Sequence, residues 1–371
     1  MAVYNIGFVI EQVLGHVTHT KNLQQNVPLD PEIRAAWGLL YFETHGLGKL
    51  IPLYKSNWTV QAGVRARKAI GRMAREGRLD ALFFHSQVPA VLARDWMRRV
   101  PSIVSVDATP RQIDTLGRFY QHPQGPQFIE RLKWQLNRDC FQAARHMVAW
   151  SNWAKQGLVD EYEVPADKVT VVPPGVNVRD WLRPAARRRQ DGATKILFVG
   201  GDLERKGGHL LIEAFRALRP LGVELHLATR EKVPAEPGLF VYNGMQPNSA
   251  ELKALYHSCD IFALPTFGDC LPMVLSEAGA AGLAVVSTQL AAIPEVVRDG
   301  ETGLLAPVGD TKALEEALRQ LVLQPELRLR MGERAVAHVA REYDAQKNAG
   351  RLLDLLKGEV DLARMHTRVA A

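Results

Sequence analysis

The stretch KILFVGGDLERKGGHLLIEAF, residues 195–215, joins an apolar run, a polar turn and an amphipathic run. The first part is typical of a buried strand, and GHLLIEAF has the apolar spacing of a helix. Between them, pairs of glycines at 200–201 and 207–208 flank Arg205 and Lys206. A strand, a tight turn and a helix in this order predict one unit of a parallel α/β sheet.

The same alternation continues on both sides of this stretch. Strands are predicted in YNIGFVI, ALFFH, SIVSV and HMVAW before it, and in ELHLAT, LFVYN, DIFALP and AVVST after it. A chain of 371 residues exceeds what one hydrophobic core usually organises. We therefore predict two α/β domains with Rossmann-like parallel sheets.

The domain boundary is predicted in a segment rich in Pro, Gly and Arg, residues 171–195, which lacks a sustained apolar period. We place an N-terminal domain at 1–178 and a C-terminal domain at 179–345. A last helical pattern at 346–371 is expected to pack back on the N-terminal domain.

The composition is that of a globular protein, with 47% hydrophobic and 23% charged residues. Three cysteines without CxxC spacing suggest neither a disulfide framework nor a zinc site. The opening MAVYNIGFVI lacks the charged segment of a signal peptide, and no run of 18 apolar residues occurs, so a cytoplasmic protein is expected.

The net charge of +6 favours anionic partners: nucleotides, phosphorylated sugars or an anionic membrane surface. The basic stretches VRARKAIGRMAREGR and RPAARRRQ are best explained as a solvated helix face and a polar linker. Peripheral membrane contact through them stays open as an alternative. Neither stretch has interleaved aromatic residues, so nucleic acid is not expected as a partner.

The glycine-rich turn is suited to an anion, because the helix amino terminus offers unpaired N–H groups beside Arg205 and Lys206. A pyrophosphate could be held there without a metal ion. The turn differs from a GxxxxGK[ST] phosphate loop, because Gly207 follows Lys206, and from a GxGxxG fingerprint. The alternative is an ordinary strand-to-helix turn with solvated charges.

A second stretch, GDCLPMVLSEAGAAG at 268–282, carries two carboxylates. Pro272 suits the first turn of a helix, and Asp269 just outside it could act as a cap. Glu277 lies roughly 7–8 Å further along the axis, so the carboxylates suit different parts of an elongated ligand. A nucleotide diphosphate sugar has this order: ribose diol, pyrophosphate, sugar hydroxyls. Small residues around Glu277 argue against a freely solvated side chain.

With these stretches the chain resembles the retaining glycosyltransferases of family 4, whose GT-B architecture has two facing Rossmann-like domains with a cleft between them. The resemblance runs through most of the carboxy-terminal half. It includes VVPPGVNVRDW, the 195–215 stretch, LYHSCDIFALPT, DCLPMVLSEA and IPEVVRDGETGLLAPVGD, in the family's order and approximate spacing.

The resemblance implies roles for several donor-site residues. In the family's signature of two Glu residues with seven residues between them, this chain has Asp269 and Glu277. Glu277 would bind the ribose hydroxyls and Asp269 the transferred sugar, although its side chain is one methylene shorter than Glu. Backbone groups would contact the sugar and pyrophosphate at Leu271, Pro272 and Met273.

The leaving diphosphate would be neutralised by Arg205 and Lys206, which is why no metal or other cofactor is expected. Many family members have Arg where this chain has Gly201, and Arg205 looks like its substitute. The loop that begins at Met245 matches the family's base-binding loop. Its alternative explanation is an ordinary connection.

The amino-terminal half matches less closely. Only Gly15 stands where members have a glycine pair, and it would let the loop approach the donor phosphate. His16 and His19 are either acceptor contacts or surface residues. Asp107 replaces a strand-end His and would bind a donor-sugar hydroxyl or orient the acceptor, unless it only starts a turn. Two further candidates have less support: His85 and Asp114.

The resemblance implies metal-independent transfer of a sugar, a hexose by expectation, from a UDP or GDP sugar to a hydroxyl acceptor in carbohydrate biosynthesis. Donor binding is expected in the carboxy-terminal domain, acceptor binding in the other, and domain closure would assemble the site. The alternative is a nucleotide-sugar-binding protein without transfer activity, suggested by Asp107 and Gly201. The sequence specifies neither the nucleobase, the sugar, the acceptor and its linkage, nor the oligomeric state.

Overall fold

The computed structural model describes residues 3–13, 15–41, 57–117, 119–120, 125–184 and 192–369. The chain forms two compact units. Unit 1 comprises Met1–Gln112, His122–Pro173 and Ala345–Ala371, and unit 2 comprises Ile113–Gln121 and Pro174–Asp344. Each unit contains one six-stranded parallel sheet, which is the Rossmann-like architecture expected from the sequence.

The sheet of unit 1 has the strand order β2-β1-β3-β4-β5-β6. Its strands are β1 (Tyr4–Glu11), β2 (Ile33–Leu40), β3 (Ala81–Phe84), β4 (Ser102–Val106), β5 (His146–Ala149) and β6 (Val169–Val171). Its helices are α1 (His16–Asn26), α3 (Trp58–Glu76), α4 (Gln87–Ala90), α5 (Arg94–Met97), α7 (Gln127–Ala143), α8 (Asn152–Tyr162) and α16 (Ala345–Val369). The short helix α6 (Pro110–Thr115) crosses from unit 1 into unit 2.

Helices cover both faces of this sheet, which explains why its central strands are nearly continuous apolar runs. On one face, Val9 of β1 belongs to a core that includes Ile70 of α3. On the other face, Phe8 belongs to a core that includes Leu23 of α1 and Leu356 of α16. Alternate residues of one strand therefore serve two cores, as the strand period requires.

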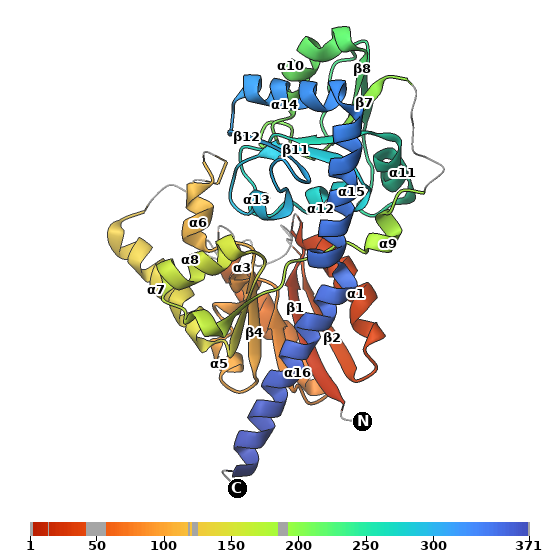
Figure 1. The fold of residues 1–371 in the computed structure, drawn as a ribbon. Coiled ribbons are helices and arrows are strands. Elements are labelled where there is room, and N and C mark those ends of the chain that lie inside the picture. The colour runs from red at the N-terminus through yellow and green to blue at the C-terminus, as the bar shows by residue number, and fades with distance from the viewer. Residues whose placement is uncertain are drawn as a thin grey trace. The chain divides into compact units, whose positions relative to one another are not determined.

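The last helix, α16, supplies much of the second core although it follows unit 2 in the sequence (Figure 1). Its buried residues include Leu352, Leu353, Leu356 and Val360. Polar contacts fix its exposed side, where Lys357 Nζ lies 3.0 Å from Asp30 Oδ2. Unit 1 thus depends on a segment more than 300 residues away from β1 in the chain.

The sheet of unit 2 has the order β12-β11-β10-β7-β8-β9. Its strands are β7 (Thr194–Val199), β8 (Val223–Ala228), β9 (Leu239–Tyr242), β10 (Ile261–Leu264), β11 (Ala284–Thr288) and β12 (Gly303–Ala306). Its helices are α9 (Val178–Trp181), α10 (Gly208–Leu218), α11 (Ala250–Ser258), α12 (Met273–Ala280), α13 (Ile293–Val296), α14 (Thr311–Leu323) and α15 (Pro325–Glu342). The 3-10 turns in the described part of the chain include η1 (Val27–Leu29), η3 (Ala166–Lys168) and η5 (Arg219–Leu221).

The predicted strand, turn and helix at 195–215 are confirmed as β7, a turn and α10. Gly207 precedes the helix with φ of +73°, in the left-handed region. A Cβ atom there would lie 1.9 Å from the Pro265 carbonyl oxygen. Only glycine permits both this conformation and this close approach of the turn to the loop after β10.

Three strands were not predicted: β2, β6 and β12. β2 is a partly buried edge strand that contains Arg34 and Gly38, so its apolar pattern is weak. β6 and β12 are also edge strands, and about half of their residues are only partly buried. The predicted linker also contains a short helix, α9, while residues 185–191 lie outside the described part of the chain.

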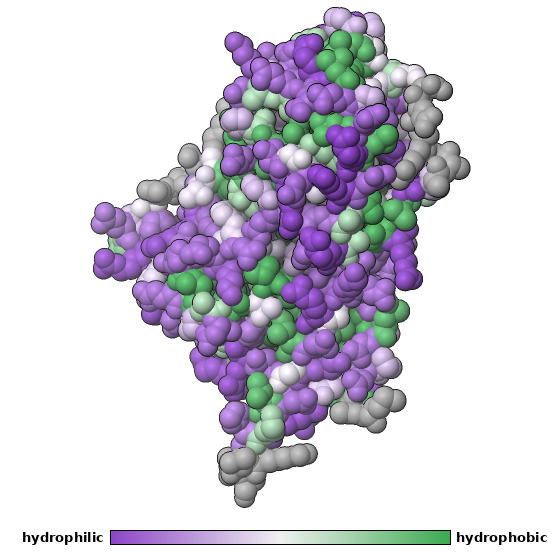
Figure 2. Space-filling view, viewed as in Figure 1, coloured by the Kyte–Doolittle hydropathy of each residue, from purple (hydrophilic) through white to green (hydrophobic). Residues whose placement is uncertain are grey.

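The surface drawn in Figure 2 is mostly hydrophilic, with apolar side chains in scattered groups. Among the described residues, no helix is both long enough and apolar enough to span a membrane. The three cysteines are buried and free: Cys140, Cys259 and Cys270.

Candidate active site

Two loops of unit 2 meet at the carboxyl ends of neighbouring strands. The turn after β7 holds Arg205 and Lys206, and the loop after β10 holds residues 265–272. The Arg205 carbonyl oxygen accepts hydrogen bonds from the Phe267 N–H (2.9 Å) and the Thr266 hydroxyl (3.2 Å). Because β7 and β10 pair in parallel, both loops leave the same edge of the sheet. This edge is where doubly wound folds bind their ligands.

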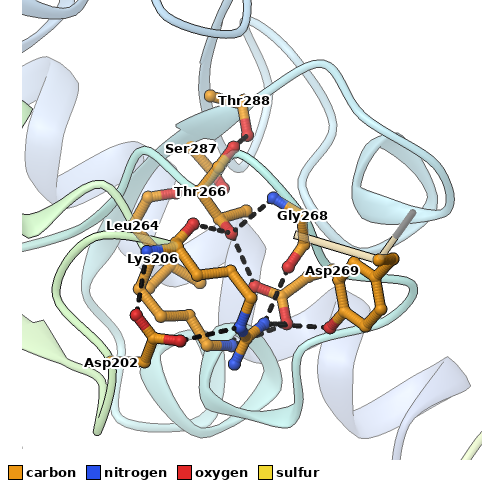
Figure 3. A network of polar contacts seen from close by, with 10 residues as sticks. Asp202, Lys206, Leu264, Thr266, Gly268, Asp269, Ser287 and Thr288 are labelled. Atoms are coloured by element: carbon orange, nitrogen blue, oxygen red, sulfur yellow. Dashed lines mark hydrogen bonds and ion pairs between the residues drawn. The ribbon is translucent and has the colours of Figure 1, made fainter. Parts of the chain in front are cut away.

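Asp269 is the centre of a charged network formed by these loops (Figure 3). Lys206 Nζ lies 2.7 and 2.8 Å from its two carboxylate oxygens, and Arg205 Nη1 lies 3.0 Å from Oδ1. The Thr266 hydroxyl donates to Oδ2 (2.7 Å). Asp269 is only 7% exposed, so these contacts are shielded from water. The two cations assigned to a diphosphate by the sequence therefore already face an internal carboxylate.

Arg205 is held from several sides. Its Nη1 also donates to the Tyr120 hydroxyl (3.0 Å) and the Gly268 carbonyl (2.7 Å), while Nε lies 3.3 Å from Asp202 Oδ2. Burial disfavours the charge, but the anionic neighbours, Asp269 first among them, raise the pKa of Arg205 above its ordinary value. The guanidinium is consequently charged and fixed in orientation.

Hydroxyl groups on β11 anchor the loop that carries Asp269 (Figure 3). Thr288 Oγ1 donates to the Thr266 carbonyl (2.8 Å), and Ser287 Oγ donates to the Leu264 carbonyl (2.8 Å). The Gly268 N–H donates to Thr266 Oγ1 (3.2 Å). The loop is therefore tied to the sheet by neutral hydrogen bonds as well as by ion pairs.

The alternative explanation of Asp269 as a helix cap is wrong. Helix α12 begins at Met273 directly after Pro272, and no side chain caps it. The Asp269 carboxylate instead turns toward the β7–α10 turn, because two cations there offer stronger partners than a helix N–H. Leu271 and Met273 are buried, each 8% exposed, and shape the loop from within.

Glu277 lies on α12 and is buried, in agreement with the small residues that surround it. Its Oε2 accepts a hydrogen bond from the Tyr256 hydroxyl of α11 (3.0 Å). Burial raises the pKa of Glu277 to about 7, although Tyr256 and the charge of Lys253 act in the opposite direction. A carboxyl group in this state can accept or donate a hydrogen bond near neutral pH.

The other predicted donor-site residues lie in loops. Gly201 follows β7 and is exposed, and Met245 is half-buried in the loop between β9 and α11. Gly15 belongs to unit 1, where it is exposed immediately before α1. Asp114, another candidate, is exposed at the end of α6.

In unit 1, polar side chains gather where β1, β3 and β4 end. Glu11 accepts hydrogen bonds from Ser86 Oγ (2.5 Å) and Trp58 Nε1 (2.8 Å), and lies 3.3 Å from His16 Nδ1. Burial raises the pKa of Asp107, with His16 opposing this shift. Asp107, a predicted site residue, is thus electrostatically coupled to the first turn of α1.

Sequence reasoning missed several members of both groups: Asp202, Thr266, Tyr120, Tyr256, Glu11, Ser86 and Trp58, together with Trp150, whose ring centroid lies 5.5 Å from that of His16. Glu11 had a usable signal, since it ends a predicted strand and the carboxyl ends of parallel strands meet at one edge. The tyrosines and tryptophans had none, because they reach their partners from helices and loops distant in sequence. In the described part of the chain, no three His, Cys, Asp or Glu side chains are arranged to hold a metal ion.

The fold and these loops define the class: two Rossmann-like units of the GT-B type. Residues 193–324 match the family model described as glycosyl transferases group 1, and residues 33–180 match the model described as glycosyltransferase family 4. The chain belongs to the glycosyltransferases of family 4, as the sequence resemblance predicted.

Among curated proteins, the D-inositol 3-phosphate glycosyltransferase of Corynebacterium glutamicum (strain R) is 32% identical over 230 residues. That match covers 54% of this chain and 54% of the relative, so it spans about half the length of the curated protein.

Among solved structures, sucrose-phosphate synthase from Thermosynechococcus elongatus superposes with a TM-score of 0.78 at 13% identity, covering 96% of this chain and 98% of that one. Anabaena Alr3699/HepE in complex with UDP-glucose superposes with a TM-score of 0.69 at 15% identity, covering 95% and 99%. These similarities establish the fold.

Proposed function

We propose that the chain transfers a sugar from a nucleotide diphosphate sugar, of the UDP or GDP type, to a hydroxyl acceptor. The observation that carries the proposal is the convergence of Arg205 and Lys206 on Asp269 at the ligand edge of the unit 2 sheet. Two cations in a partly buried loop suit a diphosphate. The UDP-glucose in the Anabaena structure adds support for a nucleotide-sugar donor.

Donor binding exchanges one anion for another. The diphosphate replaces Asp269 as the ion-pair partner of Arg205 and Lys206. The released Asp269 carboxylate then accepts hydrogen bonds from hydroxyls of the donor sugar. Glu277, on α12, accepts hydrogen bonds from the ribose diol. Backbone groups of residues 271–273 contact the sugar and the pyrophosphate.

The reaction breaks the bond between the anomeric carbon and the diphosphate oxygen, whose electron pair leaves with the nucleotide. The acceptor oxygen forms the new bond on the same face, so the configuration is retained. The acceptor proton passes to the leaving phosphate oxygen. Arg205 and Lys206 stabilise the negative charge that develops there, which removes the need for a divalent cation. In unit 1, Asp107 orients the acceptor hydroxyl.

A second candidate is a nucleotide-sugar-binding protein without transfer activity. The features that favour it are Asp107 and Gly201, which differ from the family's common His and Arg, and the internal pairing of both cations with Asp269. Both candidates bind the donor, and only the first consumes it.

The test is a thermal-shift screen of the full chain with UDP, GDP and ADP and their sugar conjugates, in the presence of EDTA. A ligand at about 100 times its dissociation constant stabilises by about 2.7 kcal/mol. Mass spectrometry then detects transferred or hydrolysed sugar, and proton NMR of the product gives the anomer. Stabilisation without turnover would favour the binding protein, an inverted anomer would refute retention, and no stabilisation by any nucleotide would refute the donor site.

Site variants make the screen specific. Arg205→Ala should lower both the thermal stabilisation by the nucleotide and the rate of sugar transfer. Arg219→Ala removes an equal charge from an exposed turn of unit 2 and should change neither quantity. Equal effects of both variants would show that the general charge, and not the proposed site, governs binding.

A further inference from the structure

The carboxyl ends of four neighbouring strands in unit 1 carry polar or aromatic residues that the donor site does not use. Glu11 ends β1, His85 follows β3, Asp107 follows β4 and Trp150 follows β5. Sheet order β1-β3-β4-β5 therefore brings them to one edge. Parallel α/β sheets bind their ligands at this edge.

Two histidines of α1 complete the group, and four rings pack together. The ring centroid of His85 lies 4.6 Å from that of His16, 4.8 Å from His19 and 5.3 Å from Trp150. The rings of His16 and His19 also lie 5.5 and 5.4 Å from Trp150. We call Glu11, His16, His19, His85, Asp107 and Trp150 the histidine cluster.

Several ring nitrogens in the histidine cluster are buried without a hydrogen-bond partner. They include Nδ1 of His19 and both Nδ1 and Nε2 of His85, a residue that is 1% exposed. A neutral imidazole has one donor and one acceptor, and each buried group left unpaired costs about 1–3 kcal/mol. Such a cost in a folded core calls for a partner that binds there.

The charges of the cluster are mainly acidic. Glu11 and Asp107 are carboxyl groups, and burial lowers the pKa of His19 to about 3 and that of His85 well below its ordinary value, so both are neutral. His16 differs: burial lowers its pKa, but Glu11 and Asp107 together raise it above the ordinary value. In the described part of the chain, no Lys or Arg is among the charged groups that shift these three histidines.

We propose that the histidine cluster binds the acceptor of the proposed transferase and that this acceptor is an uncharged polyol, not a phosphate ester. The inference rests on the proposed function, and it adds the substrate class. The acceptor proposed for this chain therefore differs from the inositol 3-phosphate in the name of the curated relatives.

The chemistry of the cluster matches hydroxyl groups. A hydroxyl both donates and accepts, so it can pair with a neutral imidazole and with a carboxylate at once. A phosphate oxygen at neutral pH only accepts, and the one imidazole of the cluster with a raised pKa, His16, already interacts with the carboxyl groups of Glu11 and Asp107. Since the unpaired nitrogens of His19 and His85 are shielded from solvent, their rings must turn toward the polyol when it binds.

The test measures polyols against their phosphates by calorimetry, using the full chain saturated with UDP. Matched pairs are myo-inositol with D-inositol 3-phosphate, and glucose, mannose and galactose with their 6-phosphates. At least one free polyol should bind about tenfold or more tightly than its phosphate, a difference of about 1.4 kcal/mol. A phosphate that binds as tightly as its polyol, or a panel without any bound polyol, would overturn the proposal.

Variants assign the preference to the cluster. Asp107→Asn should reduce the polyol preference to about threefold or less, because one of the carboxyl groups that interact with His16 is lost. Asp167→Asn removes the same group from an exposed position of unit 1 and should leave the ratio unchanged. An unchanged ratio in Asp107→Asn would refute the charge argument.

His85→Phe tests the unpaired nitrogens. It keeps an aromatic ring and removes both nitrogens, so the melting temperature should rise while polyol affinity falls about tenfold or more and UDP affinity stays the same. A higher melting temperature with unchanged polyol affinity would show that the ring only fills the core. The proposed function is tested separately, by UDP binding and by sugar transfer. Polyol binding is also measured without nucleotide, so the polyol site can be tested even if UDP does not bind.

Discussion

Glu277→Gln should stabilise unit 2 at alkaline pH and at the same time weaken nucleotide binding. The carboxyl is buried, and burial raises its pKa from 4.5 to about 7. At pH values between these two pKa values, the folded protein holds a proton on Glu277 that the unfolded chain has lost. The free energy of unfolding therefore falls as the pH rises from 4.5 to about 7. At about 1.4 kcal/mol per pH unit, the full loss is about 3 kcal/mol.

Glutamine removes this loss because it does not ionise, while its amide oxygen still accepts the Tyr256 hydrogen bond. Relative to the original chain, the variant should gain up to about 3 kcal/mol at about pH 8 and much less at about pH 5. For a domain of this size, 3 kcal/mol corresponds to roughly 6–12 °C in melting temperature.

The assay is thermal unfolding at both pH values, compared as the difference between variant and original chain so that other titrating groups cancel. Glu213→Gln, on the exposed side of α10, is the matched control and should change stability by less than about 0.5 kcal/mol at either pH. UDP affinity of Glu277→Gln should fall about tenfold, since a charged hydrogen bond is worth about 1.5–3 kcal/mol. A stability difference that does not grow with pH would refute the reasoning about the buried carboxyl.

Asp269→Asn should lower stability by about 3 kcal/mol, because it leaves Arg205 and Lys206 without their carboxylate. It should also bind inorganic pyrophosphate more tightly than the original chain in calorimetry, and weaker binding would contradict the exchange of anions. Arg205→Ala should lower kcat about 100-fold with a smaller change in the donor KM, and equal kcat values would remove its role. Gly207→Ala should cost about 3 kcal/mol or more in urea unfolding, because the added Cβ meets the carbonyl oxygen of the loop after β10. Gly244 has φ of +80° but open space around it, so Gly244→Ala should lower the free energy of unfolding by only about 1–2 kcal/mol. Similar losses in the two variants would refute the clash at Gly207.

The fold could be predicted because parallel strands buried on both faces are short apolar runs, and this chain has nine of them in readable form among its strands. The strands that were not predicted, β2, β6 and β12, lie at sheet edges and are incompletely buried. β2 lies at the edge of its sheet, so only part of its side chains must be apolar.

The candidate site was predictable residue by residue but not as a network. Arg205, Lys206 and Asp269 each stood out by type and position in the sequence. Their mutual pairing depends on how the loop after β10 approaches the turn after β7, through the bond between the Phe267 N–H and the Arg205 carbonyl. Tertiary contacts of this kind leave no local pattern in the sequence.

The histidine cluster of unit 1 could also be predicted only in part from the sequence. The spacing of His16 and His19 places both on one side of a helix, which the sequence alone indicates. Their contact with His85 requires the strand order, and the place of Trp150 requires β5 to lie next to β4. Both are properties of the assembled sheet.

The position of α16 has a consequence for synthesis of the protein. Unit 1 contains β1 from the beginning of the chain, yet Leu352, Leu356 and Val360 of its core are translated only after all of unit 2. On the ribosome, unit 2 can therefore finish folding while the sheet of unit 1, already translated through β6, still exposes the apolar surface that α16 will cover. Domains of nascent chains commonly fold in order from the N-terminus. In this chain we expect the order to be reversed, and a chaperone that binds nascent apolar segments should meet the Phe8 side of the first sheet.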